Sequence, residues 1–361
     1  MASTTIPVVV VGTGFGCRIQ IPALRAAGFE VAGLVGTNAE RTRERAKANA
    51  VPNAFTELDE AIHRTGARAV TIAAPPHAHA RLTLAAIAHG CHVICEKPFA
   101  RDVAEARHLL DAAERAGVIH LMGHEFRFAP ERAMMARLIA AGAIGAPKLA
   151  NFTALIPYLV GPNLDMPHWW FNEETGGGWL GAASPHLIDW IRFTLGDFES
   201  LSGGLATLAP QNGDADDTFQ FRFRLKNGLE GMVQQSAASW GPPVDLCRVM
   251  GTKGTILLEG TEIKLADASG LRTIPIADDL RLPPLPQLTA DPRHETPKWK
   301  MLIQIELPPY IRLCEAFRDL IQGRRPACAV PLPTFRDGVA SMEAIDAVRS
   351  SAAAGGTLIK L

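Results

Sequence analysis

A lysine occupies the most chemically informative place in the chain, directly after an apolar stretch. Residues His92 to Cys95 have the composition of a buried strand, and Glu96-Lys97-Pro98 follows as a turn. An ammonium group at the end of a buried strand is unfavourable unless a carboxylate pairs with it or its charge has a chemical task. We therefore predict that Lys97 stands where a bound cofactor meets its substrate.

A second set of chemically capable residues follows the glycines Gly176 to Gly178, whose backbone can approach another surface closely. Ser184 suits a helix N-cap and Pro185 the first helical position, so we expect a helix to begin there. His186 and Asp189 then share one face of that helix. The positive end of the helix dipole favours neutral imidazole at His186, which suits a general acid/base. The alternative is a histidine satisfied by hydrogen bonds inside the protein.

The elements that position these residues begin with a glycine-rich loop. The β-branched run Ile6 to Val11 is typical of a strand buried on both faces, and Phe29 to Val35 completes a βαβ unit. Between them, Gly12 allows a tight turn, Gly14 lets the backbone approach a pyrophosphate, and a helix N-terminus faces the anion. Cys17 holds the place of the third glycine and is small enough for close packing. The predicted dinucleotide contacts are Gly12, Thr13, Gly14, Phe15 and Gly16.

The end of the second strand indicates which cofactor binds. NAD-binding proteins usually carry an acidic residue there for the ribose 2′-hydroxyl. This chain instead has Gly36-Thr37-Asn38, with Arg41 and Arg43 beyond. Thr37 and Arg41 can hold a 2′-phosphate, so NADP is favoured over NAD. The alternative is that the arginines are solvated helix residues.

Strands and helices continue to alternate up to residue 123, which predicts a doubly wound parallel sheet. Ligands collect beyond the carboxyl ends of such strands, where we place Pro75 and His79 as cofactor contacts beside Glu96 and Lys97. His79 has an alternative as a helix-capping or solvated residue. Cys95, like Cys91, is expected to be a small core residue.

After residue 123 the pattern changes. Phe219 to Leu225 alternates phenylalanine with polar residues, and Lys226-Asn227-Gly228 predicts a hairpin turn into the next strand. We therefore expect a Rossmann dinucleotide-binding domain at 1–123 and, at 124–361, an α+β domain with an open, mainly antiparallel sheet. Residues 282–297 are proline-rich and are expected to form a loop. Two helices, 310–322 and 334–353, are expected to close the chain.

Composition excludes several functional classes. The 361 residues are 47% hydrophobic and 20% charged with a net charge of -1, so neither nucleic acid nor a membrane surface is an expected partner. The run Ile6 to Val11 is too short to span a bilayer, and no signal peptide is evident. Six cysteines without CxxC pairing argue against zinc or disulfides and for reduced thiols in a cytoplasmic protein. No metal site is expected.

The Gly12–Cys17 loop, Glu96-Lys97-Pro98 and the segment Gly176–Asp189 together resemble the glucose-fructose oxidoreductase / inositol dehydrogenase / MocA (Gfo/Idh/MocA) family. The resemblance covers nearly the whole chain, including the closing pattern Pro333-Thr334-Phe335-Arg336-Asp337-Gly338. It implies a Rossmann domain followed by an α/β domain whose open sheet often forms the dimer interface and carries the substrate face. Members typically oxidise or reduce sugars, inositols and related polyols with NAD or NADP.

The resemblance also implies roles for single residues. Family lysines matching Lys97 contact the reacting hydroxyl or the nicotinamide ribose, and histidines matching His186 act as acid/base. Glu96 and Pro98 match residues that position the lysine. We further expect a homodimer or homotetramer formed through the carboxy-terminal sheet.

One departure from the family pattern puts the substrate in doubt. Members often show Gly-Gly-Gly-x-Leu-x-Asp-x-Gly-x-His, but here Ala182 stands at the aspartate position and Ser184 at the later glycine. Either Lys97 and His186 suffice, or another polar group replaces the carboxylate, or the reaction has changed. The candidates for that replacement are Tyr158, Asn172 and His168.

The predicted substrate contacts combine aromatic and charged residues. Tryptophans offer flat apolar faces to sugar C–H groups, although they are equally suited to the core. Arg127 binds a substrate oxygen or pairs with Glu125. The predicted contacts are Arg127, Tyr158, Trp169, Trp170 and Asp189.

The resulting hypothesis is hydride transfer between a nicotinamide and a secondary alcohol or ketone of a sugar-like small molecule. In it His186 moves the proton while Lys97 orients the oxygen and stabilises its negative charge. Two alternatives stay open: a non-redox enzyme of the same fold that oxidises its substrate transiently, and a catalytically decayed NADP-binding regulator.

Overall fold

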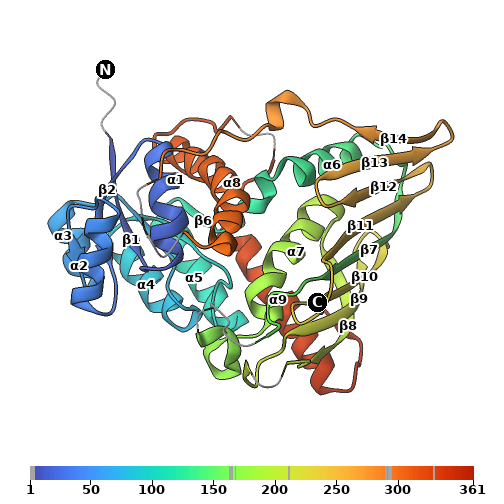
Figure 1. Ribbon diagram of the computed structural model, residues 1–361, viewed down its shortest axis with the longest axis horizontal. Coiled ribbons are helices and arrows are strands. Elements are labelled where there is room, and N and C mark those ends of the chain that lie inside the picture. The colour runs from blue at the N-terminus through green and yellow to red at the C-terminus, as the bar shows by residue number, and fades with distance from the viewer. Residues whose placement is uncertain are drawn as a thin grey trace. The chain divides into compact units, whose positions relative to one another are not determined.

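In the computed structural model, the described residues are 5–161, 166, 168–209, 212–288, 291, 295–327 and 330–361. They pack as two compact units, which Figure 1 shows as ribbons. The first unit comprises Met1–Ala129 and Leu282–Val339, and the second comprises Pro130–Arg281 and Ala340–Leu361. The division into domains 1–123 and 124–361 stays a prediction. Compact packing of residues does not show that a segment folds independently as a domain.

The first unit is built on a six-stranded sheet of order β3-β2-β1-β4-β5-β6, in which every pair is parallel. The predicted doubly wound parallel sheet is therefore confirmed. All side chains of β1 except that of Pro7 are buried, as its β-branched run indicates. The strands are β1 (Ile6–Val11), β2 (Phe29–Val35), β3 (Ala54–Phe55), β4 (Ala69–Ile72), β5 (His92–Cys95) and β6 (His120–Met122).

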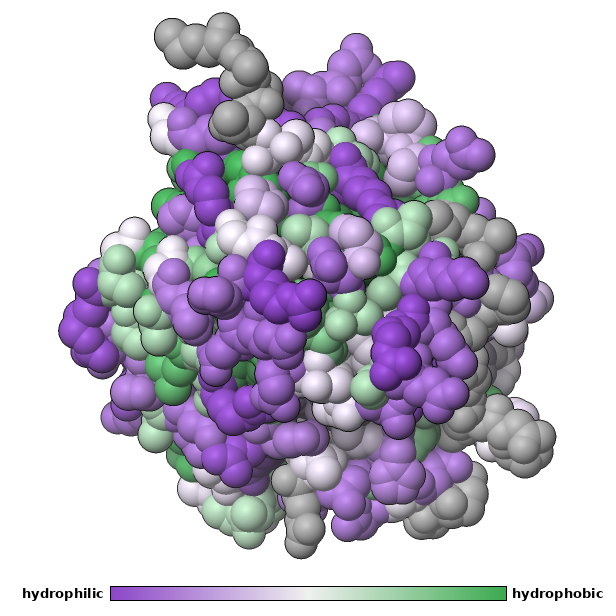
Figure 2. Space-filling model, turned by 90° about the vertical axis from the view of Figure 1, so that its left-hand side faces the viewer, coloured by the Kyte–Doolittle hydropathy of each residue, from purple (hydrophilic) through white to green (hydrophobic). Residues whose placement is uncertain are grey.

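Helices connect these strands, and two of the connecting helices begin at residues whose side chains cap them. Asn38 and Asp102 accept hydrogen bonds from backbone N–H groups three residues later, which satisfies free donors of the first turn. Figure 2 shows that the face carrying α2 and α3 is covered mainly by hydrophilic residues. The helices of this unit are η1 (Gly16–Gln20), α1 (Ile21–Ala26), α2 (Ala39–Ala48), α3 (Leu58–Thr65), α4 (Pro76–Ala88), α5 (Val103–Ala116), η2 (Glu125–Phe128) and α8 (Pro297–Ile321).

The helix α8 begins earlier than the predicted range 310–322. It includes Pro308 and Pro309, which the sequence analysis treated as lying before a helix start. A proline inside a helix costs a hydrogen bond and clashes with the preceding turn. Both prolines are buried here, as are Leu307 and Tyr310. Tertiary burial therefore outweighs the local preference to end the helix.

The carboxyl half of α8 is anchored on the Rossmann sheet and its first helix. Phe317 is fully buried and stacks on Phe29 of β2, with ring centroids 5.9 Å apart. Arg318 donates a hydrogen bond of 2.8 Å to the carbonyl oxygen of Ala27, at the end of α1. These contacts place a late segment of the chain in the first unit. The proline-rich stretch before α8 is described except for residues 289, 290 and 292–294.

The second unit contains a nine-stranded sheet of order β14-β13-β12-β11-β7-β10-β9-β8-β15. Among its described pairs only β7 and β10 run parallel, so the predicted mainly antiparallel sheet is confirmed. The strands are β7 (Pro147–Leu155), β8 (Phe198–Ala206), β9 (Thr218–Leu225), β10 (Glu230–Ser236), β11 (Val244–Gly251), β12 (Gly254–Glu259), β13 (Glu262–Asp267), β14 (Gly270–Ile274) and β15 (Ile359–Lys360).

One face of this sheet forms the core of the second unit. The predicted alternation along β9 is present, with Phe219, Phe221 and Phe223 buried and the residues between them exposed. The helix α7 packs on this face, where the Trp190 ring meets Phe152 edge-on with centroids 5.4 Å apart. The helices are α6 (Pro130–Ala140), η3 (His168–Phe171), η4 (Glu173–Thr175), α7 (Trp179–Leu195), η6 (Asp278–Leu280) and α9 (Phe335–Ala353), whose first residues belong to the first unit.

Candidate functional site

The glycine-rich loop has the backbone geometry of a phosphate-binding turn. Gly12 has φ +114°, and a Cβ there would lie 2.3 Å from the carbonyl oxygen of Ala73, so only glycine fits. Its N–H donates to the carbonyl of Val35 at 2.9 Å. At Gly14 a Cβ would meet nothing within 4 Å, and at Gly16 it would lie 2.9 Å from a methyl group of Val10. The loop therefore packs against the strands and leaves Gly14 facing open space.

Thr13 in this loop is held by a residue that the sequence analysis missed. The Arg45 guanidinium of α2 donates to both the carbonyl and the hydroxyl oxygen of Thr13, the latter at 2.9 Å. Gly36 lies beneath Thr13: a Cβ at Gly36 would be 2.6 Å from side-chain atoms of Thr13 and Thr42. A side chain at position 36 would therefore require Thr13 and Thr42 to shift.

Thr37 and Arg41 lie together at the end of β2. Both are exposed, and the Arg41 Nη2 lies 3.4 Å from the Thr37 hydroxyl, at the long end of a hydrogen bond. Asn38 caps α2 through the Arg41 backbone N–H, at 2.9 Å. An exposed hydroxyl and guanidinium beside a glycine loop fit a phosphorylated ribose.

Lys97 is half-buried at the end of β5 and lies beside the glycine loop. Its ammonium nitrogen is 5.7 Å from the centroid of the Phe15 ring. The Lys97–Pro98 peptide bond is cis. His79 is fully buried, with Nδ1 2.9 Å from the Pro98 carbonyl oxygen and Nε2 2.7 Å from that of Ala74. His79 thus joins the ends of β4 and β5 through their backbone.

Pro75 is the exposed N-cap of α4, next to that contact. It lies at the carboxyl end of β4, where a ligand of the sheet is expected.

Glu96 is a buried anchor for the same turn. Its Oε1 accepts hydrogen bonds from the Tyr310 hydroxyl at 2.8 Å and from Gln20 Nε2 at 3.2 Å, and Gln20 Nε2 is also 2.9 Å from the Tyr310 oxygen. Burial raises the pKa of Glu96, while the Lys97 ammonium and the Tyr310 hydrogen bond lower it. Tyr310 and Gln20 give no signal in the sequence, since each reaches Glu96 from another element of the fold.

Arg127 is almost fully buried in η2. Its Nη2 forms an ion pair with Asp337 Oδ1 at 2.8 Å, and its Nη1 donates to the Pro331 carbonyl at 3.1 Å. These contacts tie η2 to the first turn of α9 and to the segment before it. Its predicted substrate contact stays a prediction.

The helix that carries His186 begins earlier than predicted. α7 starts at Trp179 with Gly178 as N-cap, and Pro185 lies inside it. Ser184 is not the N-cap: its hydroxyl donates to the Leu180 carbonyl. His186 is therefore beyond the first turn, and the helix-dipole argument for a neutral imidazole loses its basis. The prediction was wrong because burial of the helix outweighs the tendency of proline to start one.

Aromatic rings gather around the start of α7. Tyr158 meets Trp179 edge-on at 6.2 Å, Trp170 lies 5.9 Å from Trp179, and Trp169 lies 5.7 Å from Trp170, all between ring centroids. Trp169, Trp170 and Tyr158 are half-buried. Three of the predicted substrate contacts are therefore brought together in the second unit. Ring faces of this kind suit sugar C–H groups.

The other polar candidates in this region differ in their surroundings. Asp189 is 1% exposed and Ala182 is 3% exposed, so both lie in the interior of the unit. Asn172 caps η4 by accepting from the Thr175 N–H at 3.1 Å. His168 is exposed and Tyr158 half-buried, so these two can reach a ligand.

A carboxyl group that the sequence analysis missed lies at the N-terminus of α7. Asp216 accepts from the Leu180 N–H at 2.8 Å, and its backbone carbonyl accepts from the Trp179 N–H at 2.7 Å. Gly178 has φ +98°, and a Cβ there would lie 2.1 Å from Asp216 Oδ1. Burial raises the pKa of Asp216 to about 6, with Arg349 and the Leu180 hydrogen bond opposing the shift.

Other chemistry is limited in the described part of the chain. Burial raises the pKa of Cys91 to about 11 and raises that of Cys95 further, so these thiols stay protonated core groups. Cys328 lies outside the described residues. No group of three His, Cys, Asp or Glu side chains among the described residues is placed to hold a metal ion. No helix within the described ranges has the length and apolar character to cross a bilayer.

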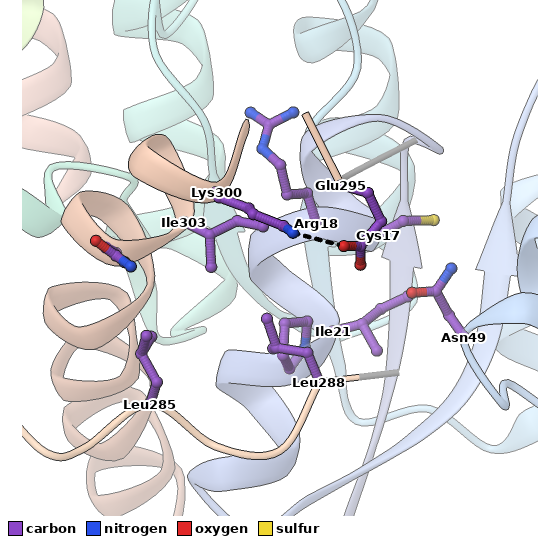
Figure 3. Close-up of a pocket in the computed structure, with 11 residues that line it drawn as sticks. Cys17, Arg18, Ile21, Asn49, Leu285, Leu288, Glu295, Lys300 and Ile303 are labelled. Atoms are coloured by element: carbon purple, nitrogen blue, oxygen red, sulfur yellow. Dashed lines mark ion pairs between the residues drawn. The ribbon is translucent and has the colours of Figure 1, made fainter. Parts of the chain in front are cut away.

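A cavity of about 200 Å³ lies in the first unit beside η1 and α1 (Figure 3). Cys17 and Arg18 line one side, and Ile303 of α8 lines another. Lys300 and Glu295 form an ion pair of 2.8 Å at this cavity. None of the predicted site residues lines it.

A parallel Rossmann sheet with a glycine loop after β1 is typical of enzymes that bind a dinucleotide. Two family descriptions match the sequence: "Oxidoreductase family, NAD-binding Rossmann fold" over residues 6–124 and "GFO/IDH/MocA C-terminal domain" over residues 133–257. The chain belongs to the Gfo/Idh/MocA family of NAD(P)-dependent oxidoreductases.

Similar proteins include sugar-converting enzymes. The chain is 28% identical to an uncharacterised oxidoreductase of Synechocystis over 97% of this chain and 94% of that protein. It is 28% identical to 1,5-anhydro-D-fructose reductase of Ensifer adhaerens, over 93% of this chain and 92% of that protein. A levoglucosan dehydrogenase solved in complex with NADH and levoglucosan is 25% identical, with TM-score 0.84 and 99% of both chains covered.

Asp216 makes stability depend on pH. Its pKa rises from 3.8 to about 6 on folding, so the folded protein binds this proton more tightly than the unfolded chain does. The stabilisation is complete below pH ~4 and is lost as the pH rises to ~6, by about 3 kcal/mol in total. In Asp216→Asn the amide oxygen can still accept from Leu180, and this loss disappears. Urea unfolding of both proteins across the window measures the difference.

Asp214→Asn is the matched control, because Asp214 is exposed in the same loop. Its pH–stability curve should run parallel to that of the native protein. Parallel curves for Asp216→Asn would contradict the prediction.

Proposed function

We propose that this protein transfers hydride between a nicotinamide cofactor and a secondary alcohol or ketone of a sugar, inositol or related polyol. The observation that carries the proposal is Lys97, a half-buried ammonium group beside the glycine loop, with its preceding residue fixed by Tyr310 and Gln20. Family membership supports the reaction class, and the similarity to levoglucosan dehydrogenase and 1,5-anhydro-D-fructose reductase supports a sugar-like substrate.

In the proposed mechanism the protein positions the substrate and moves its proton. When bound, the nicotinamide supplies the hydride acceptor or donor. The Lys97 ammonium orients the substrate oxygen and stabilises negative charge that develops on it. His186 takes the hydroxyl proton during oxidation and returns it during reduction. The rings of Trp169, Trp170 and Tyr158 cover apolar C–H faces of the substrate.

Substitution of the two proposed groups separates their roles. His186→Ala should lower kcat about 10²- to 10⁴-fold, the usual contribution of a positioned acid/base. Lys97→Met should lower kcat/KM at least as much, because it removes charge stabilisation in the transition state. Steady-state rates follow from the absorbance of the reduced nicotinamide during a polyol and keto-sugar panel.

His63→Ala and Lys226→Ala are matched controls, since both side chains are exposed and lie away from the proposed groups in sequence. Unchanged rates in Lys97→Met and His186→Ala would remove the roles proposed for these two groups. NADP binding by a native protein that turns over no compound of the panel would favour the regulator. Product formation without net change in nicotinamide absorbance would instead identify the non-redox alternative.

We further propose NADP as the preferred cofactor, with NAD as the alternative. The proposal is supported by exposed Thr37 and Arg41 at the end of β2, and by a glycine, Gly36, where NAD-binding proteins usually carry an acidic side chain. The levoglucosan dehydrogenase structure was solved with NADH, so this chain would differ from that protein.

Arg41→Ala tests the cofactor proposal. Loss of a charged hydrogen bond to a 2′-phosphate should weaken NADPH binding about 10- to 100-fold and leave NADH binding unchanged. Binding is followed by the fluorescence of each reduced cofactor. Arg43→Ala, on the same exposed helix, is the control for charge alone. A native protein that binds NADH more tightly than NADPH would refute the proposal.

We propose that two or four copies of this chain assemble through the outer face of the carboxy-terminal sheet. Leu149 of β7 and Met232 of β10 are 48% and 54% exposed on adjacent strands of this face. Apolar side chains of this kind favour a protein interface. Met232→Asp should shift the mass from light scattering toward the monomer, whereas Leu208→Asp, on a loop, should not. A monomeric native protein would contradict the assembly.

A further inference from the structure

The peptide unit that joins Thr13 to Gly14 lies at the accessible edge of the glycine loop. Gly14 is exposed, and a Cβ there would meet nothing within 4 Å. The second glycine of such a loop is the point at which the backbone approaches a pyrophosphate. The orientation of this peptide unit therefore decides whether an N–H group or a carbonyl oxygen faces the anion.

Arg45 of α2 holds the carbonyl end of this peptide unit. Its Nη1 donates to the Thr13 carbonyl oxygen at 2.5 Å and to the Thr13 hydroxyl oxygen at 2.9 Å. Nη1 carries two hydrogens, so both bonds can form at once. Both side chains are half-buried, which reduces competition from water. Hydrogen bonds from a guanidinium are also stronger than those between neutral groups.

The planarity of the peptide transmits this hold to Gly14. The Thr13–Gly14 bond is trans, so the Thr13 carbonyl and the Gly14 N–H point in opposite directions. A carbonyl directed toward Arg45 consequently leaves the Gly14 N–H directed away from it. The next peptide unit is held separately, because the Gly14 carbonyl accepts from the Arg18 N–H at 3.1 Å.

The loop alone would not keep this orientation. Glycine at position 14 allows the peptide unit to rotate, since glycine adopts positive and negative φ about equally. A rotated unit would present the Thr13 carbonyl oxygen in place of the Gly14 N–H. That oxygen carries partial negative charge and would repel a pyrophosphate. Arg45 opposes the rotation, because the rotation would break its hydrogen bond to the carbonyl.

Gly36 leaves the room that Thr13 occupies in this arrangement. A Cβ at Gly36 would lie 2.6 Å from Thr13 Cγ2 and 2.6 Å from Thr42 Oγ1. Thr42 is buried, and its hydroxyl donates to the Asn38 carbonyl at 2.6 Å. A side chain at position 36 would therefore press on the residue that Arg45 holds.

We propose that Arg45 is a positioning residue for the dinucleotide. It holds the Thr13–Gly14 peptide unit so that the Gly14 N–H faces the pyrophosphate. NAD and NADP share this pyrophosphate, so Arg45 acts on both cofactors alike, unlike Arg41 at the 2′-phosphate. The role rests on the dinucleotide binding that the proposed function requires, but on neither its hydride transfer nor its substrate.

Stopped-flow fluorescence with NADH and NADPH tests this role in Arg45→Met, which keeps a long apolar side chain and lacks the donors. Both cofactors should bind about 10- to 100-fold more weakly, the usual effect of a lost charged hydrogen bond. The loss should appear in the association rate constant, because only molecules with the correct peptide orientation can bind. The dissociation rate constant should stay the same, since the contacts with the bound cofactor are retained.

Arg43→Met is the matched control, because Arg43 is exposed on the same helix, and both rate constants should equal those of the native protein. A loss confined to NADPH would overturn the proposal and make Arg45 a ligand of the 2′-phosphate. A loss carried by the dissociation rate would overturn it in favour of direct contact with the cofactor. Unchanged binding of both cofactors would overturn it as well.

If Arg45→Met does not fold, Arg45→Gln, which is shorter and neutral, gives the same comparison with the same outcomes. A native protein that binds neither cofactor would also overturn the role of Arg45. A native protein that binds a cofactor but turns over no sugar or polyol would count against the proposed function alone, because binding is measured without substrate.

Discussion

The hydrogen bonds on Glu96 are the interaction on which the candidate site depends. One carboxylate oxygen accepts from Tyr310 and Gln20, so a single atom joins β5, η1 and α8. Glu96 is buried and directly precedes Lys97, so the position of the ammonium group follows from the position of this carboxyl. The cost of burying the carboxyl is met by two hydrogen bonds and a neighbouring cation. Removing any of these partners would leave a charge in the interior with less to stabilise it.

Several strands of both units could be predicted from local patterns in the sequence. The apolar runs of β1 and β2 and the intervening glycines predict a parallel βαβ unit, and the structure contains it with those bounds. The alternating phenylalanines of β9 likewise predict a strand buried on one face. Such patterns are readable because a strand or a tight turn is decided mainly by neighbouring residues.

Contacts between residues distant in sequence explain the predictions that were wrong or missing. Both α7 and α8 begin earlier than predicted and continue through prolines, Pro185 in α7 and Pro308 and Pro309 in α8, since burial of the surrounding side chains outweighs the lost hydrogen bond. Long-range contacts also account for the missed site residues. Arg45 reaches Thr13 from α2, and Asp216 reaches Leu180 from another part of the second unit. No local pattern marks a side chain whose partner is distant in sequence.

The nucleotide-binding unit is not a contiguous segment of the gene product. Its sheet ends before residue 130, yet the unit is completed by residues 282–339, which include Tyr310 and Phe317. A recombination event that exchanged only the amino-terminal sheet and helices would separate Glu96 from the hydroxyl that binds it. The Glu96-Lys97-Pro98 turn and the helix α8 must therefore be inherited together. The two halves of the chain are expected to diverge together, as one evolutionary unit.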